Sequence, residues 1–202
     1  MSAILAVAVY AWSLAVLIAA SRSRGLGSLR ADFGWAIRPV DLLYAAGAAV
    51  GLYFVAVVFG PIARSLGPVS TNIHLSGDRV WDVVAVFFIP TLVAAPVEEL
   101  LFRGLLMRWI RIWLIRHGGG QRADGRTSTL PIHVSVLVSA VVFALAHLYE
   151  VSGPASLVNL ELHTFALAVV NGYLATRTGR LGGAVVTHAL LNLIAGVTLL
   201  TQ

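Results

Sequence analysis

Residues 96–103 read PVEELLFR and place two adjacent carboxylates and an arginine inside a long apolar run. A charged side chain near the centre of a bilayer costs on the order of 2.5–3.5 kcal/mol on insertion scales. The 202-residue chain is 58% hydrophobic and 11% charged. Soluble domains carry roughly 25% charged residues. The composition therefore predicts a membrane protein, in which charges at lipid depth mark a functional site.

Apolar runs of spanning length recur along the whole chain. The longest, residues 80–113, exceeds one simple span, and Pro90 and Pro96 should kink or break its helix. We therefore predict an all-α, polytopic membrane bundle of about six transmembrane helices, with a range of six to eight. Residues 1–202 should form a single membrane domain. The expected spans are 3–20, 40–63, 80–113, 131–148, 157–176 and 181–200.

Arginines gather in three of the connecting segments and account for most of the net charge of +5. These segments, 21–38, 108–126 and 177–180, are expected to face the cytoplasm, with both termini outside. The positive charge fits anionic lipid head groups and not nucleic acid. The chain has no cysteine, which excludes disulfides and thiolate chemistry. We expect a multi-pass protein of the cell membrane, of the prokaryotic inner-membrane type, with its first span retained.

Helical spacing separates the two glutamates of the opening stretch. Glu99 and Arg103 stand four residues apart on one helix face, with the acid N-terminal to the base, which favours an ion pair. Phe102 occupies the equivalent place for Glu98. Glu98 is thus left free to face a cavity, where a carboxylate can act as a general base. The alternative is a structural cluster of ion pairs that locks helices together.

Two later apolar segments carry histidines. His147 ends the span that begins near Pro131, and His188 stands four residues before Asn192. Each alone fits an interhelical or interfacial hydrogen bond. Combined with a free carboxylate, two imidazoles and an amide can activate water and stabilise the oxyanion of peptide hydrolysis. His163 and Asn171 are assigned to packing or loop contacts.

The same residues allow a second mechanism. A Zn²⁺ ion held by Glu98, His147 and His188 would acidify its bound water. No His-Glu-x-x-His motif supports this alternative, and no Gly-x-Ser-x-Gly motif supports a serine nucleophile. The residues leave the metal-dependent and the metal-independent mechanisms equally open.

The chain carries three motifs in order: Glu98-Glu99-x-x-x-Arg103, Phe143-x-x-x-His147 and His188-x-x-x-Asn192. In this order they resemble the motifs of the CAAX protease and bacteriocin-processing family of intramembrane proteases. The flanking sequences Ala-Pro-Val and Phe-Arg-Gly also fit, and the resemblance covers about residues 90–192, within a family-like catalytic core at about 80–200.

The resemblance implies a role for each motif residue. Glu98 and Glu99 would form the glutamate motif, with Glu98 activating water and His147 assisting it. His188 and Asn192 would form the oxyanion site or contribute to metal binding. Arg103 and Phe143 would orient these groups.

A shared site requires His147 and His188 to lie at similar depth in the membrane. Either the helix near Pro131 therefore starts well inside the cytoplasm, or the chain re-enters the membrane near Gly153.

We therefore expect an intramembrane endopeptidase that cleaves a membrane-associated peptide or protein, lipidated or not. Its partners would be this hydrophobic substrate and membrane lipids, without nucleic acid, and the sequence does not specify an oligomeric state. Two other classes fit the intramembrane charges: an ion or solute transporter, and a non-catalytic immunity or scaffold protein that retains the motifs.

Overall fold

The computed structural model describes residues 3–68, 75–121 and 127–201, and over these ranges the chain forms helices and no strand. Six helical segments in this part are long and apolar enough to cross a membrane. Each segment overlaps one predicted span, which confirms the all-α bundle. Arg122 and Arg126, which were predicted to face the cytoplasm, lie outside the described residues. The segments are Ile4–Arg24, Val40–Ser65, Arg79–Gly119, Leu130–Glu150, Pro154–Thr178 and Gly182–Leu200.

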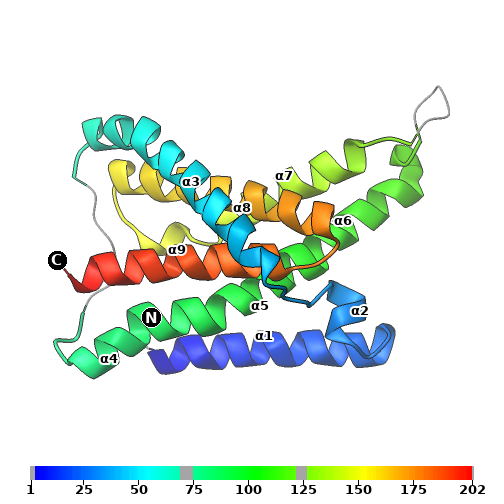
Figure 1. Cartoon of the computed structure of the whole chain (residues 1–202), viewed down its shortest axis with the longest axis horizontal. Helices are drawn as coiled ribbons and strands as arrows, with labels where there is room; N and C mark the ends of the chain where they lie inside the picture. The colour runs from blue at the N-terminus through cyan, green and yellow to red at the C-terminus, as the bar shows by residue number, and fades with distance from the viewer. Residues whose placement is uncertain (1–2, 69–74, 122–126, 202) are drawn as a thin grey trace.

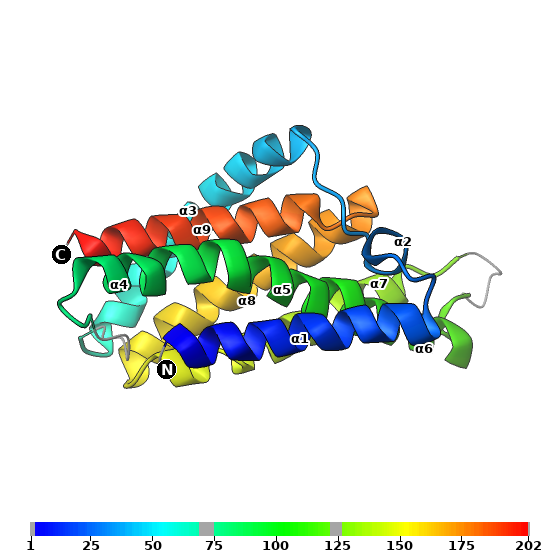
Figure 2. The same cartoon turned by 90° about the horizontal axis from the view of Figure 1, so that it is seen from below.

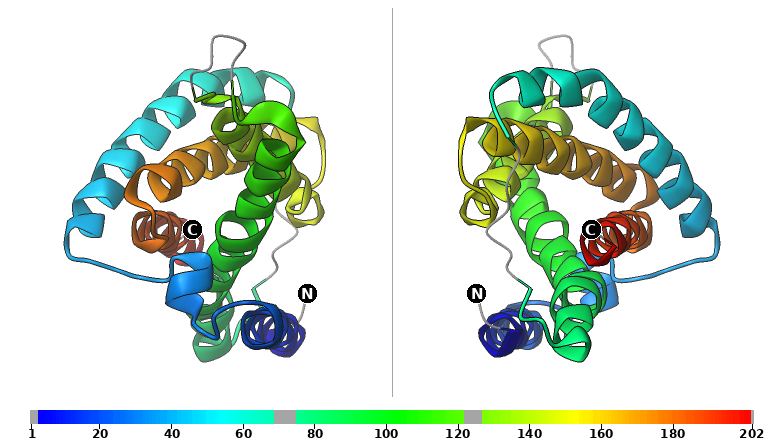
Figure 3. Two further views of the ribbon diagram at one scale, coloured as in Figure 1. Left: turned by 90° about the vertical axis from the view of Figure 1, so that its right-hand side faces the viewer. Right: turned by 90° about the vertical axis from the view of Figure 1, so that its left-hand side faces the viewer.

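The bundle is built around helix α9 (Gly182–Leu200) and the long helix that runs from Arg79 to Gly119. Helices α3 (Val40–Ser65) and α8 (Pro154–Thr178) pack against α9 and against each other, and α7 (Leu130–Leu145) packs on α8. Helix α1 (Ala3–Arg24) lies at the edge, beside the long helix and the short α2 (Leu29–Phe33) (Figures 1 to 3). No more than about a third of the most apolar window of each span is buried within the protein, as expected for helices solvated by lipid.

The long helix is continuous through the glutamates, where its winding changes, and it is interrupted by a kink at His117 and Gly118 near its end. Its two prolines remove backbone donors, and the amide of Ala95 donates to the carbonyl of Pro90, five residues back, as in a π-helix. The prediction of a kinked or broken helix is thus met by one bent helix that crosses once. Its segments are α4 (Arg79–Val83), η1 (Val84–Ala94), α5 (Ala95–Glu99), η2 (Leu100–Leu106), α6 (Met107–Leu114) and η3 (Ile115–Gly119).

Polar side chains from other helices bond the carbonyls of the π-wound segments. Asn192 of α9 donates to the Pro90 carbonyl at 2.9 Å, and Ser139 of α7 donates to the Phe102 carbonyl at 3.0 Å. Backbone acceptors at membrane depth need such internal partners because lipid offers none. The altered winding therefore ties the long helix to both helices that carry the histidine motifs.

The connections between α1 and α3, α6 and α7, and α8 and α9 lie at one end of the bundle (Figure 1). At this end Arg180 forms a buried ion pair with Asp41, which fixes the start of α3 to the turn before α9. The end of α6 and the start of α7 extend beyond the other helices (Figure 1). Helix α7 therefore starts beyond the bundle and brings His147 to the depth of Glu98. This favours the prediction that the helix near Pro131 starts well inside the cytoplasm over the prediction of a re-entrant chain near Gly153.

Close contact between α9 and η1 depends on a glycine. A Cβ atom at Gly196 would lie 2.5 Å from the carbonyl oxygen of Val86, too close for any side chain. We expect Gly196→Ala to separate the helices and to destabilise the protein by about 1–3 kcal/mol. Gly51→Ala is the matched control, because nothing lies within 4 Å of its Cβ position and alanine favours a helix. Equal melting temperatures for the two variants in detergent would contradict this packing.

Candidate functional site

Glu99 is the fully buried centre of a polar cluster between the long helix, α8 and α9. One of its oxygens, Oε1, lies 2.9 Å from Arg103 Nη1, 3.0 Å from Asn171 Nδ2 and 3.0 Å from His188 Nδ1. The predicted Glu99–Arg103 ion pair is thus present, as a charge contact without the alignment of a hydrogen bond. The Arg103 guanidinium also stands 4.3 Å above the ring of Phe143 and gains a cation–π contact.

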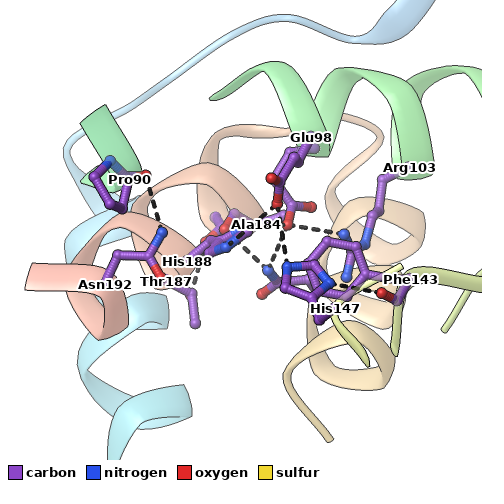
Figure 4. A network of polar contacts seen from close by, with 12 residues as sticks. Pro90, Glu98, Arg103, Phe143, His147, Ala184, Thr187, His188 and Asn192 are labelled. Atoms are coloured by element: carbon purple, nitrogen blue, oxygen red, sulfur yellow. Dashed lines mark hydrogen bonds and ion pairs between the residues drawn. The ribbon is translucent and has the colours of Figure 1, made fainter. Parts of the chain in front are cut away.

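Glu98 faces two histidines, as Figure 4 shows. Its Oε2 atom lies 3.7 Å from His147 Nε2 and 3.8 Å from His188 Nε2. Its other oxygen, Oε1, accepts a hydrogen bond of 2.5 Å from the hydroxyl of Tyr10 on α1. The two glutamates therefore occupy different environments, in line with the spacing argument.

In each of the two histidines, the hydrogen bond made by Nδ1 determines that Nε2 is the ring nitrogen that faces Glu98. His147 Nδ1 lies 2.7 Å from the Phe143 carbonyl, which can only accept, so this Nδ1 carries a hydrogen and donates it. His188 Nδ1 donates to the carboxylate of Glu99 in the same way. Both Nε2 atoms are consequently turned toward Oε2 of Glu98.

A cavity of about 440 Å³ connects these groups. Its apolar lining, called the apolar arm below, comes mainly from η1 and α9 and includes Ile89, Ala195, Leu199 and Leu75. The polar residues that line it are Tyr10, Asp82, Glu98, His147, Tyr149, Glu150, His188 and Asn192. A cavity with converging polar groups and an apolar extension is the usual form of a binding site for an apolar ligand.

The structure brings together all the predicted motif residues. Glu98, His147, His188 and Asn192 line the cavity, and Glu99, Arg103 and Phe143 lie behind them. The predicted role of each remains a prediction.

Three further residues belong to the site. Asn171 was assigned to packing, although an amide in a span was a usable signal; it donates to Glu99 and to the Ala184 carbonyl. Tyr10 and Glu150 gave no signal in the sequence, because one is an aromatic in an apolar run and the other lies in a turn. His163 bonds the Asn159 carbonyl of its own helix, in agreement with the predicted packing role.

A metal centre requires at least three ligand side chains that converge on one point. Across residues 3–68, 75–121 and 127–201, no group of three or more His, Asp or Glu side chains is gathered closely enough to hold a metal ion. In this structure Glu98, His147 and His188 are therefore not arranged as a metal centre.

A comparison with protein-family models finds one that matches residues 80–194, more than half of the chain: type II CAAX prenyl endopeptidase Rce1-like. The chain belongs to this family. The match includes every motif residue and leaves α1 and α3 outside it. Searches of curated proteins and of solved structures found no match. Family membership and six apolar helices make this chain a multi-pass membrane protein of a CAAX-type protease family.

Proposed function

We propose that this Rce1-like protein is an intramembrane endopeptidase in which Glu98 activates the water that attacks the peptide bond. One observation carries the proposal: a single carboxylate oxygen faces the Nε2 atoms of both histidines at 3.7 and 3.8 Å. These separations exceed a direct hydrogen bond and suit one water molecule that contacts all three groups.

The reaction follows from this arrangement. Oε2 of Glu98 takes a proton from the water as the water oxygen attacks the carbonyl carbon, and His147 orients that water. Asn192 uses one N–H for the Pro90 carbonyl, and its second N–H can donate to the oxyanion. Glu98 then passes the proton to the leaving nitrogen, and the C–N bond breaks to give a carboxylic acid and an amine.

His188 can join the oxyanion site only with hydrogens on both ring nitrogens, because its Nδ1–H already donates to Glu99. Glu99 accepts from this Nδ1, and its carboxylate lies 2.9 Å from the guanidinium of Arg103. Glu99 and Arg103 thus support the oxyanion donor and do not touch the substrate.

The apolar arm of the cavity supports a proposal for the substrate class and for the side from which it binds. Leu75, Tyr149 and Leu199 line the cavity and lie shortly before α4, between α7 and α8, and at the end of α9. These parts of the chain are at the end of the bundle opposite the α1–α3, α6–α7 and α8–α9 connections (Figure 1). We infer an apolar, membrane-associated peptide that reaches Glu98 from the side opposite the arginine-rich connections. The apolar arm accepts a lipid-modified peptide as well as an unmodified one.

The proposed orientation of the cavity predicts which single-cysteine variants are labelled from outside the cell. The chain lacks cysteine, so Tyr149→Cys at the cavity rim and Ser23→Cys near the arginine-rich end each carry one thiol. Under the positive-inside rule, an impermeant maleimide should label Tyr149→Cys in intact cells and Ser23→Cys only after permeabilisation. The reverse pattern would place the cavity mouth in the cytoplasm.

A proteoliposome assay separates the proposed peptidase from a transporter. The peptidase releases new peptide termini from an apolar substrate and carries no pH-driven flux. Flux without cleavage would favour the transporter, and neither activity, with an unchanged phenotype in motif variants, would favour a scaffold.

A further inference from the structure

Helix α1 delivers a hydroxyl to the glutamate that the proposed function uses as its base. Tyr10 donates to Glu98 Oε1 at 2.5 Å, although the two residues are 88 positions apart in the chain. Helix α1 lies outside the matched residues 80–194, so this contact comes from a part of the chain that the family model does not cover.

The placement of Tyr10 results from one face of α1. Ala6, Tyr10, Leu17 and Ser21 recur at helical spacing, and Ala6, Leu17 and Ser21 are buried. Leu17 belongs to the core cluster that contains Leu100 of the long helix. Leu14 packs against the same cluster, and the exposed large hydrophobic side chains of α1 are Ile4, Leu5, Val7, Val9, Trp12 and Val16. The buried face therefore determines how the helix sits.

The end of α1 is fixed at its connection to α2. The Ser21 hydroxyl donates to Asp32 at 2.5 Å, and the amides of Leu26 and Ser28 donate to the same carboxylate. These hydrogen bonds, the one from Ser21 first, hold the pKa of Asp32 below its usual value. Their stabilisation is present above the ordinary carboxylate pKa and is lost only as the pH falls through the lowered one. The connection is thus firm at neutral pH.

The hydrogen bond from Tyr10 places the two carboxylate oxygens of Glu98 in different environments. Oε1 is held by Tyr10, and Oε2 is turned toward His147 and His188. A carboxylate on a flexible side chain can rotate and exchange its oxygens, and a donor on one of them restrains that rotation. Such restraint is how a supporting side chain keeps a reactive group in a productive geometry.

We propose that Tyr10 is a positioning residue, whose hydroxyl fixes Glu98 Oε1 so that Oε2 stays between the two histidines. The proposal rests on the proposed peptidase function. It makes α1 part of the site and not only a membrane anchor. Tyr10 acts through Glu98 and has no contact with the reacting atoms.

The test compares Tyr10→Phe, which removes only this hydroxyl, with Tyr53→Phe, the same change on an exposed side chain of α3. A hydrogen bond to a charged group is typically worth a factor of about 10–100. We expect Tyr10→Phe to lower kcat by about that factor and to leave KM within about twofold of the wild type, because uniform binding is untouched. Tyr53→Phe should match the wild type.

The pH profile gives a readout that a purely structural role would not change. Loss of the donor should move the acidic limb of kcat/KM to higher pH, because the hydroxyl favours the carboxylate form of the base. The other titratable groups around Glu98 stay in place in this variant: His147, Tyr149 and Glu150, His188 on α9, and Arg103 on its own helix. A wild-type profile with wild-type kcat, or a rise in KM alone, would overturn the proposal.

A melting-temperature cycle tests the contact without activity. Tyr10→Phe should lower the melting temperature in the wild-type background and leave it unchanged in a Glu98→Ala background. Equal shifts in both backgrounds would refute the hydrogen bond. A wild-type protein that cleaves no peptide would instead refute the proposed function, and with it the positioning role, while the cycle still decides the contact.

Discussion

Replacement of Glu98 by glutamine is expected to abolish peptide cleavage, with kcat reduced by roughly 10²- to 10⁴-fold, while the protein still folds. Glutamine keeps the shape of the side chain and an oxygen that can accept from Tyr10, but it cannot take a proton from water. Initial rates on a fluorogenic apolar peptide, with the melting temperature of each preparation, measure both parts of this expectation.

The matched control is Glu161→Gln. Glu161 is also a glutamate at membrane depth, but it lies in a separate apolar groove between α7 and α8, beside Val141 and Leu145. Its replacement should leave kcat unchanged. If Glu98→Gln retains the activity of Glu161→Gln, then Glu98 is not the base, and the roles assigned to the two histidines are also wrong.

Arg103→Met is expected to cause the largest loss of stability, about 3–5 kcal/mol. The substitution leaves the fully buried carboxylate of Glu99 without its guanidinium, and it removes the cation on the Phe143 ring. Denaturation in detergent micelles, followed by helical circular dichroism, would measure the free energy of unfolding.

Two further variants locate the cause of this loss. Arg116→Met removes an exposed arginine of the same long helix and should change stability by no more than about 0.5 kcal/mol. Addition of Glu99→Gln to Arg103→Met should recover part of the loss, because it removes the orphaned charge. Arg103→Met and Arg116→Met of equal stability would show that the ion pair does not support the fold.

The local part of the site could be predicted from the sequence. The spacing of Glu99 and Arg103 implied a pair on one helix face, and the pair is present. The same spacing left Glu98 without a partner on its own helix, and its contacts come from α1 and from the two histidine segments. Helical geometry fixes such relations within a few residues, whatever the rest of the chain does.

Helical spacing alone could not predict contacts between distant helices. Tyr10 is one of two aromatics in the apolar run 3–20, and only the packing of α1 shows that it reaches Glu98. The Asp41–Arg180 pair joins residues 139 positions apart, and no periodicity connects them. Asn171 carried a signal, since an amide in a span needs a partner, but the sequence did not say which partner.

The long helix shows why the element was easier to predict than its form. Two prolines in an apolar run predict a kinked or broken helix. They do not show that the chain stays helical by π-winding, or that side chains of α7 and α9 bond the carbonyls of those turns. The depth of His147 was uncertain for a related reason: it depends on how far α7 extends beyond the bundle (Figure 1).

The most direct test is a cleavage assay on the purified protein with an apolar peptide library, with and without a chelator, read by mass spectrometry. The proposed mechanism predicts discrete new termini from the wild-type protein, the same termini in the chelator, and none from Glu98→Gln. Cleavage that the chelator abolishes and added metal restores would contradict the metal-independent mechanism. No cleavage by folded wild-type protein, or equal cleavage by Glu98→Gln, would contradict the central claim that Glu98 activates water in this cavity.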